Sequence, residues 1–220
     1  MKSAGTTGGN VPADVVKIIN AVDAADYLTL EHLLSSGAKP TPAGSPLSPL
    51  HAAITHFSDG KLVCDLRTLK LLLDHGADPN FVDRDSGFTA LEDALALGDV
   101  TCTTLLTKAG ASTQSPDQRK ESLLEFAVRG AIHTDRIDIL QLVLSWGVDP
   151  NTQSGERRWT ALHEAVWWNN ELTVRELLRS GADPCIADST KQIPLDIAIN
   201  LKISAPIQNA LRGAMQACKE

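Results

Sequence analysis

Residues 159–184 read W-T-A-L-H-E-A-V-W-W-N-N-E-L-T-V-R-E-L-L-R-S-G-A-D-P, and this stretch predicts two short helices followed by a stop. Thr160 is an N-cap residue whose hydroxyl can accept a hydrogen bond from a free amide of the first turn. Apolar residues recur at helical spacing from Leu162 and again from Val174. Gly181 supplies the left-handed conformation that ends the second helix. One helix pair is too small to bury its own apolar face, so the stretch predicts that similar pairs stack against it.

Two features of this stretch, the capped helix start at Thr160 and the glycine stop at Gly181, recur along the chain. Helix starts of the same type begin at residues 48, 89, 122 and 193, and Gly stops begin at residues 37, 76, 110 and 147. Successive helix starts are 41, 33, 38 and 33 residues apart, and successive stops are 39, 34, 37 and 34 residues apart. The sequence therefore predicts a repeat of about 33 residues, with extra residues in the second unit near 56–65 and in the fourth unit near 131–135.

These phased starts and stops resemble those of ankyrin repeat proteins, whose unit opens its first helix with T-P-L-H-x-A. The resemblance covers about residues 12–217 and implies an all-α solenoid of stacked helix-turn-helix units with short hairpin loops. We expect a flexible leader, residues 1–11, and a single domain, residues 12–220. About six repeats, including the caps, are expected at residues 12–40, 41–80, 81–112, 113–151, 152–184 and 185–220.

Composition narrows the class of protein. The formal net charge of −7 disfavours nucleic acid as a partner, because phosphate recognition usually needs a basic surface. Four cysteines, Cys64, Cys102, Cys185 and Cys218, lie far apart without a C-x-x-C pair, and no signal peptide is evident. We therefore expect reduced thiols in an intracellular protein, cytoplasmic or nuclear, with no disulfide framework and no membrane segment.

The sequence offers little from which to build a catalytic site. It contains no G-x-S-x-G, H-E-x-x-H, Walker A or G-x-G-x-x-G pattern. His51 and His163 occupy the place of the signature histidine in the ankyrin unit, which implies a structural role for both. The acidic residues at helix starts, Glu92, Asp93, Glu125 and Asp196, are expected to cap helices. We predict a protein that is not an enzyme, with no catalytic residue, cofactor or metal.

The ankyrin resemblance implies that the concave face and the hairpin fingers bind other proteins. By this resemblance the partner-facing ladder falls at Thr55/His56, Ala96/Leu97, Arg129/Gly130, Trp167/Trp168 and Asn200/Leu201. The finger positions include Phe88, Arg119, Arg157 and Trp159. Asn80 and Asn151 close D-P-N turns; such asparagines can be hydroxylated in ankyrin proteins, and the alternative is a turn residue.

Repeats four and five stand out for their aromatic and basic residues. Trp167 and Trp168 follow the core Leu162 by five and six residues and should point away from the buried stripe. We call Trp159, Trp167 and Trp168 the aromatic patch. The basic rim that should surround it consists of Arg119, Lys120, Arg129, Arg157 and Arg158.

The aromatic patch and basic rim would suit a peptide with bulky apolar anchors and acidic flanks, because Trp and Arg dominate binding hot spots. Alternatively, one tryptophan packs between helix layers and Trp159 is a hydrophobic staple at its helix start, like Phe88. The partner-binding residues predicted on the ladder and fingers are His56, Phe88, Leu97, Arg119, Arg129, Arg157, Arg158, Trp159, Trp167 and Trp168.

The sequence thus predicts a monomeric, non-enzymatic protein–protein interaction module that acts as an adaptor, scaffold or inhibitor. Two alternatives remain open. The chain could be the ankyrin portion of a larger enzyme or receptor, where it positions a substrate or autoinhibits a neighbouring domain. It could also bind nucleic acid through the basic rim, in which case binding would depend steeply on salt.

Overall fold

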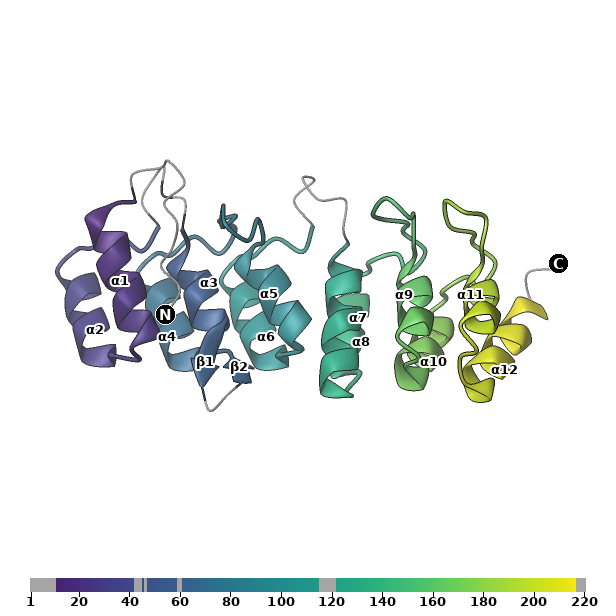
Figure 1. Ribbon diagram of the computed structural model, residues 1–220. Coiled ribbons are helices and arrows are strands. Elements are labelled where there is room, and N and C mark those ends of the chain that lie inside the picture. Colours follow the sequence, from purple (N-terminus) through teal and green to yellow (C-terminus); the bar gives the residue numbers. More distant parts are fainter. Residues whose placement is uncertain (1–10, 42–44, 46, 59–60, 115–121, 217–220) are drawn as a thin grey trace. The chain divides into compact units, whose positions relative to one another are not determined.

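A computed structural model describes residues 11–41, 45, 47–58, 61–114 and 122–216 (Figure 1). The chain divides into two compact units, which we treat separately. Unit 1 comprises residues 1–94 and 101–112, and unit 2 comprises residues 95–100 and 113–220. The boundary runs through α5 (Ala90–Leu97) and α6 (Val100–Lys108). The expected single domain over residues 12–220 stays a prediction.

Unit 1 contains the first two helix pairs. Its remaining helices are α1 (Ala13–Asp23), α2 (Tyr27–Ser35), α3 (Pro49–Ile54) and α4 (Leu66–Asp74). Helix α1 packs against α3 and α2 against α4, so each pair stacks on the next. The fully buried side chains between them include Ile18, Leu30, Leu50, Leu69 and Leu72. This stacking buries the apolar stripe that a single helix pair would leave exposed.

The extra residues of the second repeat form a β-hairpin between α3 and α4. Strand β1 (His56–Ser58) pairs antiparallel with β2 (Lys61–Val63), with His56 opposite Val63. All three side chains of β2 are exposed to solvent. The predicted position of this insertion, residues 56–65, is confirmed, while its strand conformation was not foreseen.

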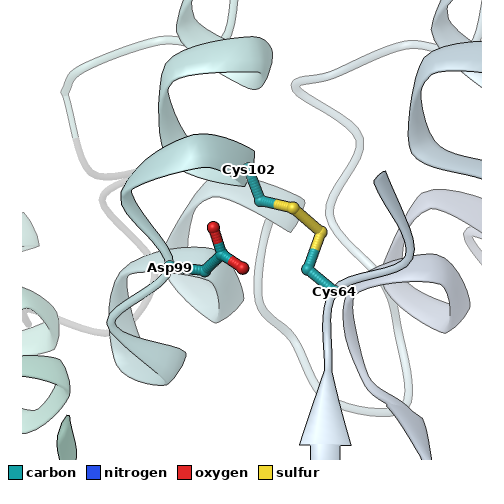
Figure 2. Close-up of side chains that lie close together, drawn as sticks. All are labelled: Cys64, Asp99 and Cys102. Carbon is teal, nitrogen blue, oxygen red and sulfur yellow. A yellow bond between two sulfur atoms is a disulfide. The ribbon is translucent and has the colours of Figure 1, made fainter. Parts of the chain in front are cut away.

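The expectation of reduced, unpaired cysteines is wrong. Cys64, which follows β2, forms a disulfide with Cys102 of α6, and both residues belong to unit 1 (Figure 2). Cys185 is also disulfide-bonded, and Cys218 lies outside the described residues. The two bonded cysteines of unit 1 are 38 residues apart in sequence, so no local spacing rule would have paired them.

Unit 2 is a stack of three helix pairs. These helices are α7 (Leu123–Thr134), α8 (Asp138–Ser145), α9 (Ala161–Trp167), α10 (Glu171–Arg179), α11 (Pro194–Asn200) and α12 (Ala205–Ala214). Helix α9 packs against both α7 and α11, and α10 packs against α12. Figure 1 shows α7, α9 and α11 in one layer of this unit. The predicted all-α helix-turn-helix architecture is confirmed.

The extra residues of the fourth repeat lengthen α7 by one turn. This helix has 12 residues, whereas α9 and α11 have 7 each. Asp135 ends α7 in the left-handed conformation (φ 53°), as Asn169 and Lys202 do after α9 and α11 (φ 52° and 54°). The residues of α7 that correspond to Trp167 and Trp168 are therefore His133 and Thr134, rather than the Arg129/Gly130 pair expected from sequence.

Gly130 lies one turn before the end of α7 and is buried against the end of α5. A Cβ atom at residue 130 would stand 2.0 Å from the Leu95 carbonyl oxygen and 2.8 Å from the Gly98 Cα. Gly98 itself has a positive φ of 71°. Two glycines thus allow the backbones of α5 and α7 to approach closely, so Gly130 does not belong to a partner-facing ladder.

Polar side chains secure the helix starts and the turns. The Ser122–Glu125 capping box and the reciprocal Thr89–Glu92 bonds are both present. Asn80 accepts from the Ser112 amide (2.6 Å) and donates to the Gly110 carbonyl (3.0 Å). In unit 2, Asn151 bonds the corresponding groups of Asp183 and Gly181. These contacts support the turn-residue interpretation of both asparagines.

The two signature histidines are structural, as expected. His163 is fully buried, its Nδ1 accepts a hydrogen bond from the Thr160 amide (3.2 Å), and its Nε2 lies 3.2 Å from the Gln192 carbonyl oxygen. Burial lowers the pKa of His163, which favours the neutral ring that these two bonds require. His51 forms an ion pair with Asp93, which raises the pKa of His51 although burial opposes that shift.

Candidate functional site

Two members of the aromatic patch, Trp167 and Trp168, are exposed at the end of α9. Trp167 is the last residue of this helix and Trp168 is its C-cap, and they are 42% and 58% exposed. Residues 161–166 of the same helix are all buried. Since α9 puts its first six residues into the core, the helix turn that follows carries both indoles to the surface. This exposure agrees with the predicted outward direction of the two side chains.

Trp159 has a structural role in the finger that precedes α9. It is partly buried, and its Nε1 donates a hydrogen bond to Asp188 (3.1 Å) in the next finger. Its ring centroid lies 5.4 Å from that of Trp167. Its backbone pairs with Ser154 across the finger. Trp159 therefore packs its ring against that of Trp167 and links two neighbouring fingers through Asp188. These contacts favour the packing interpretation of Trp159 over direct partner contact.

Arg157 lies over the aromatic rings. Its guanidinium carbon is 5.0 Å from the Trp159 ring centroid and 5.6 Å from that of Trp167, within the range of cation–π attraction. Within the described ranges, no carboxylate lies at ion-pair distance from Arg157. Four other arginines, Arg129, Arg136, Arg175 and Arg179, each have such a partner. Arg157 thus places an uncompensated positive charge on the edge of the aromatic patch.

A cavity of about 360 Å³ opens beside Trp168. It is lined by Ala96, Arg129, Ile132, His133 and Trp168, all of unit 2. Ile132 and His133 come from the added turn of α7, so this turn forms one wall of the cavity. The lining is mainly apolar and also includes the polar side chains of Arg129 and His133, which suits a bulky apolar side chain next to a polar or acidic one.

The other described members of the basic rim are already engaged. Arg129 donates from Nε to Glu164 (3.0 Å) and stacks on Phe126, with 5.1 Å between its guanidinium carbon and the ring centroid. Arg158 donates to Gln153 (2.8 Å) within its own finger. Arg119 and Lys120 lie outside the described residues. Among the described residues, the basic rim therefore comprises Arg157, Arg158 with its uncharged partner Gln153, and Arg129, whose charge Glu164 compensates.

Three further predicted residues occupy other places. Leu97 ends α5 and is partly buried in unit 2. Phe88 and His56 belong to unit 1, where Phe88 lies in a finger and His56 begins β1; both are partly buried. None of the three lines the cavity beside Trp168. Their predicted role in partner binding stays a prediction.

Sequence reasoning missed two of the residues that line the cavity, Ile132 and His133. The signal was present in the 38-residue step between the helix starts at 122 and 160, which is about one helical turn longer than the basic period. An insertion of that length can extend a helix without changing which face is buried. Reading it as a helical extension would have placed both residues at the surface.

Asp188 fixes the finger that supports Trp159, and its acid titration gives a first prediction. Its carboxylate accepts from the Thr190 amide and hydroxyl, the Gln192 amide and the Trp159 indole. Desolvation opposes the shift, but these hydrogen bonds lower the pKa of Asp188 to about 2. Because the folded pKa lies below the ordinary 3.8, the stabilisation is complete above pH 4 and is lost as the pH falls towards 2.

We expect Asp188→Asn to remove this contribution, which amounts to about 1 kcal/mol after screening by solvent near the surface. The measurement is urea unfolding of both proteins at pH 6 and pH 2.5, followed by tryptophan fluorescence. The stability difference between wild type and variant should shrink at the lower pH. A difference that is the same at both pH values would show that Asp188 does not stabilise the finger as a carboxylate.

None of the helices in the described residues is long and apolar enough to cross a membrane.

Comparison with known proteins identifies the repeat. The family model described as Ankyrin repeat matches residues 47–84 and 157–189. The human 2-5A-dependent ribonuclease is 37% identical over 68 residues, which are 31% of this chain and 9% of that protein. Human ankyrin repeat and SOCS box protein 6 is 32% identical over 123 residues, 53% of this chain and 28% of that protein.

A viral relative covers more of the chain. A putative ankyrin repeat protein of Fowlpox virus (strain NVSL) is 27% identical over 170 residues, 62% of this chain and 35% of that protein. The chain thus spans between 9% and 35% of the length of these three relatives.

Among solved structures, this chain has a fold similar to that of a chain in the complex of a predatory endopeptidase from Bdellovibrio bacteriovorus with an immunity protein. That chain matches with a TM-score of 0.72 and 18% identity, over 90% of this chain and 97% of that one. Such a level of identity establishes the fold alone. Together with the stacked helix pairs and their phased caps, the comparisons support an ankyrin repeat protein, with residues 47–84 and 157–189 matched as ankyrin repeats.

Proposed function

We propose that unit 2 binds a short segment of a partner protein that presents a bulky apolar side chain and a nearby carboxylate. Ankyrin repeats form protein–protein interaction modules, and the proposal adds the place and the chemistry. The observation that carries it is the pair of exposed indoles, Trp167 and Trp168, next to a cavity of about 360 Å³. Exposed aromatic residues beside a concave apolar site are typical of binding hot spots.

The cavity and Arg157 would bind different parts of the partner segment. The apolar side chain of the partner would enter the cavity between Ile132 and Trp168. Its carboxylate would meet Arg157, which has no carboxylate partner among the described residues and stands over Trp167. Arg129 would contribute less, because Glu164 already neutralises it. In this role the chain acts as a non-catalytic adaptor, scaffold or inhibitor.

Several finer points stay predictions. We expect a monomer without cofactor. A cytoplasmic or nuclear location also stays a prediction, and the paired cysteines no longer support it. Nucleic acid is a weaker candidate, because the formal net charge is −7 and Glu164 already pairs with Arg129 of the basic rim. A nucleic acid complex would lose affinity steeply as salt rises.

A second candidate function follows from the coverage of the relatives. The chain corresponds to 9% of the human 2-5A-dependent ribonuclease and 28% of the human ankyrin repeat and SOCS box protein 6. The chain could therefore act as the ankyrin portion of a larger enzyme or receptor, where the same surface would hold a substrate or a neighbouring domain. Sequencing the full transcript would distinguish a separate protein from such a portion.

The proposal can be tested without knowing the natural partner. A phage-displayed library of random 12-residue peptides would be selected against the whole chain. Selected peptides should combine Leu, Phe or Trp with Asp or Glu a few positions away. Peptides without an acidic residue, or with no shared pattern, would contradict the proposed chemistry.

We expect Arg157→Gln to weaken binding of a selected peptide about fivefold to tenfold, because one exposed charge-assisted contact is lost. The dependence of affinity on salt should also become flatter. The matched control is Arg212→Gln, since Arg212 is likewise exposed, bonds an uncharged partner (Gln208) and lies on α12. Isothermal titration at 50 and 300 mM NaCl measures both effects. Equal losses in the two variants would mean that general charge, rather than Arg157, attracts the peptide.

A further inference from the structure

We propose that the Cys64–Cys102 disulfide is a site of reversible thiol–disulfide exchange, at which a dithiol reductant releases the β1–β2 hairpin of unit 1. The proposal is independent of the binding surface of unit 2. It concerns two residues of unit 1 that the partner-binding proposal does not use. The reacting partner is a dithiol, either a small molecule or a protein with two neighbouring thiols.

We expect the hairpin to depend on the disulfide, because the described side chains of β2 are exposed and add little packing. Each strand has three residues, and an isolated two-stranded hairpin is marginally stable in water. All three side chains of β2 are exposed, including Leu62 (52%) and Val63 (37%), so β2 buries little of its own surface. Strand β1 contacts α1, whereas β2 is followed at once by Cys64. The disulfide thus fixes the strand that packing holds least.

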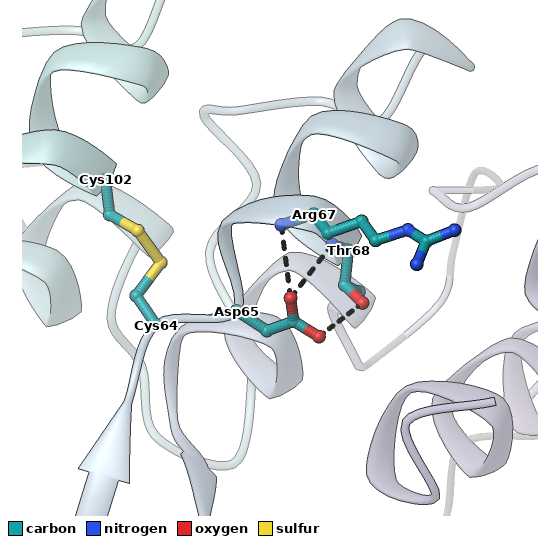
Figure 3. The surroundings of a disulfide bond; sticks show 5 residues. All are labelled: Cys64, Asp65, Arg67, Thr68 and Cys102. Carbon is teal, nitrogen blue, oxygen red and sulfur yellow. Dashed lines mark hydrogen bonds between the residues drawn. A yellow bond between two sulfur atoms is a disulfide. The ribbon is translucent and has the colours of Figure 1, made fainter. Parts of the chain in front are cut away.

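The helix that follows is secured by separate bonds, which remain when the disulfide opens. Asp65 caps α4 by accepting from the Arg67 amide (3.1 Å), the Thr68 amide (3.2 Å) and the Thr68 hydroxyl (2.7 Å), as Figure 3 shows. Asp65 also accepts from the Tyr27 hydroxyl (3.0 Å), and its own amide donates to the Ala53 carbonyl (2.8 Å). Opening the disulfide should therefore loosen the hairpin and leave α4 in place.

The two cysteines differ in burial, and we expect this difference to determine the course of exchange. Cys102 is fully buried in α6, while Cys64 is partly exposed at the end of β2. A thiolate of the reductant attacks the Cys64 sulfur, the bond to Cys102 breaks, and the Cys102 thiolate leaves and takes a proton. The second thiol of the reductant then displaces Cys64 from the mixed disulfide. The protein gains two electrons and two protons, and the reductant becomes a cyclic disulfide.

The site of attack can be mapped with a monothiol at limiting concentration, because it forms the mixed disulfide and has no second thiol in the same molecule to displace Cys64. The native, oxidised protein would be incubated with glutathione, the remaining thiols alkylated, and the peptides analysed by mass spectrometry. We expect glutathione on Cys64 and the alkyl group on Cys102. Glutathione on Cys102, or no adduct until denaturant is added, would overturn the proposal.

The release of the hairpin is tested by hydrogen exchange on the oxidised and dithiothreitol-reduced full chain. On reduction, the amides of residues 61–64 should exchange at least about tenfold faster, whereas those of α1 and α4 should keep their protection. Removal of the dithiol and reoxidation should restore the original rates. Unchanged exchange at residues 61–64, or loss of protection throughout unit 1, would contradict a releasable hairpin.

Two variants separate this disulfide from the one that involves Cys185. Cys185→Ala leaves Cys64–Cys102 intact and should respond to the dithiol as wild type does at residues 61–64. Cys64→Ser combined with Cys102→Ala should show the fast exchange without any reductant and no further change when it is added. If the double variant does not fold, the reduction and reoxidation of wild type still decide the matter.

Discussion

Replacing Gly130 with alanine is expected to destabilise unit 2 by about 3 kcal/mol, near the upper end of the usual cost of overpacking. The added Cβ would stand 2.0 Å from the Leu95 carbonyl oxygen, and that neighbour is backbone, which cannot rotate away. Either α7 moves away from the end of α5 or the last turn of α7 unwinds. Equilibrium urea unfolding, monitored by tryptophan fluorescence, measures the loss.

Gly213 provides the matched control for this substitution. It is exposed in α12, and a Cβ atom there would meet nothing within 4 Å. Gly213→Ala should stabilise the chain by up to about 1 kcal/mol, because alanine restricts the unfolded chain and favours the helix. If the two variants unfold at the same urea concentration, the close approach of α5 and α7 is not a constraint on unit 2.

The largest effect on binding is expected from Trp167→Ala combined with Trp168→Ala. Loss of both indoles should weaken binding of a selected peptide at least about 100-fold, since truncating one hot-spot residue costs about 2 kcal/mol or more and the costs of neighbouring residues are not simply additive. The fold should survive, because both side chains are exposed and the six residues before them form the buried part of α9. Titration calorimetry measures the affinity, and circular dichroism checks the helix content.

Leu28→Ala is the control for the paired tryptophan substitution. Leu28 is 79% exposed on α2 of unit 1 and lines no part of the cavity beside Trp168. Its removal should leave the peptide affinity unchanged. If the double tryptophan variant binds as tightly as the Leu28 variant, the aromatic patch is not the binding surface.

The repeat architecture could be predicted from sequence because its signals are local. Each Thr or Ser at a helix start and each Gly at a helix end specifies a backbone conformation within a few residues. Their period then determines that the helix pairs stack. The same reasoning located both insertions, since each lengthens the distance between two marks that are otherwise constant.

The conformation of those insertions could not be predicted in the same way. Seven or four extra residues can form a loop, a hairpin or a further helical turn, and the outcome depends on what the insertion packs against. In the fourth repeat, Gly130 allows a longer α7 to pass close to α5. In the second repeat, the disulfide with Cys102 holds the end of the hairpin. Both causes are contacts with residues of the third repeat, which a pattern within one repeat does not reveal.

The binding surface was predicted in part for the same reason. The helical period correctly placed Trp167 and Trp168 outside the buried stripe of α9. The cavity next to Trp168 depends on the added turn of α7, so its walls did not follow from the fifth repeat alone. Trp159 stands one residue before the same helix, yet its bond to Asp188 turns it inward. Contacts between repeats, rather than position within one, decide which tryptophans are available.

Indole N–H signals in a two-dimensional NMR spectrum test the central claim most directly, because the chain has four tryptophans. A selected peptide would be added to ¹⁵N-labelled protein. The signals of Trp167 and Trp168 should shift on binding. Those of Trp146, at the end of α8, and of Trp159, bonded to Asp188, should move little. Shifts confined to Trp146, or an unchanged spectrum with bound peptide, would place the binding surface elsewhere.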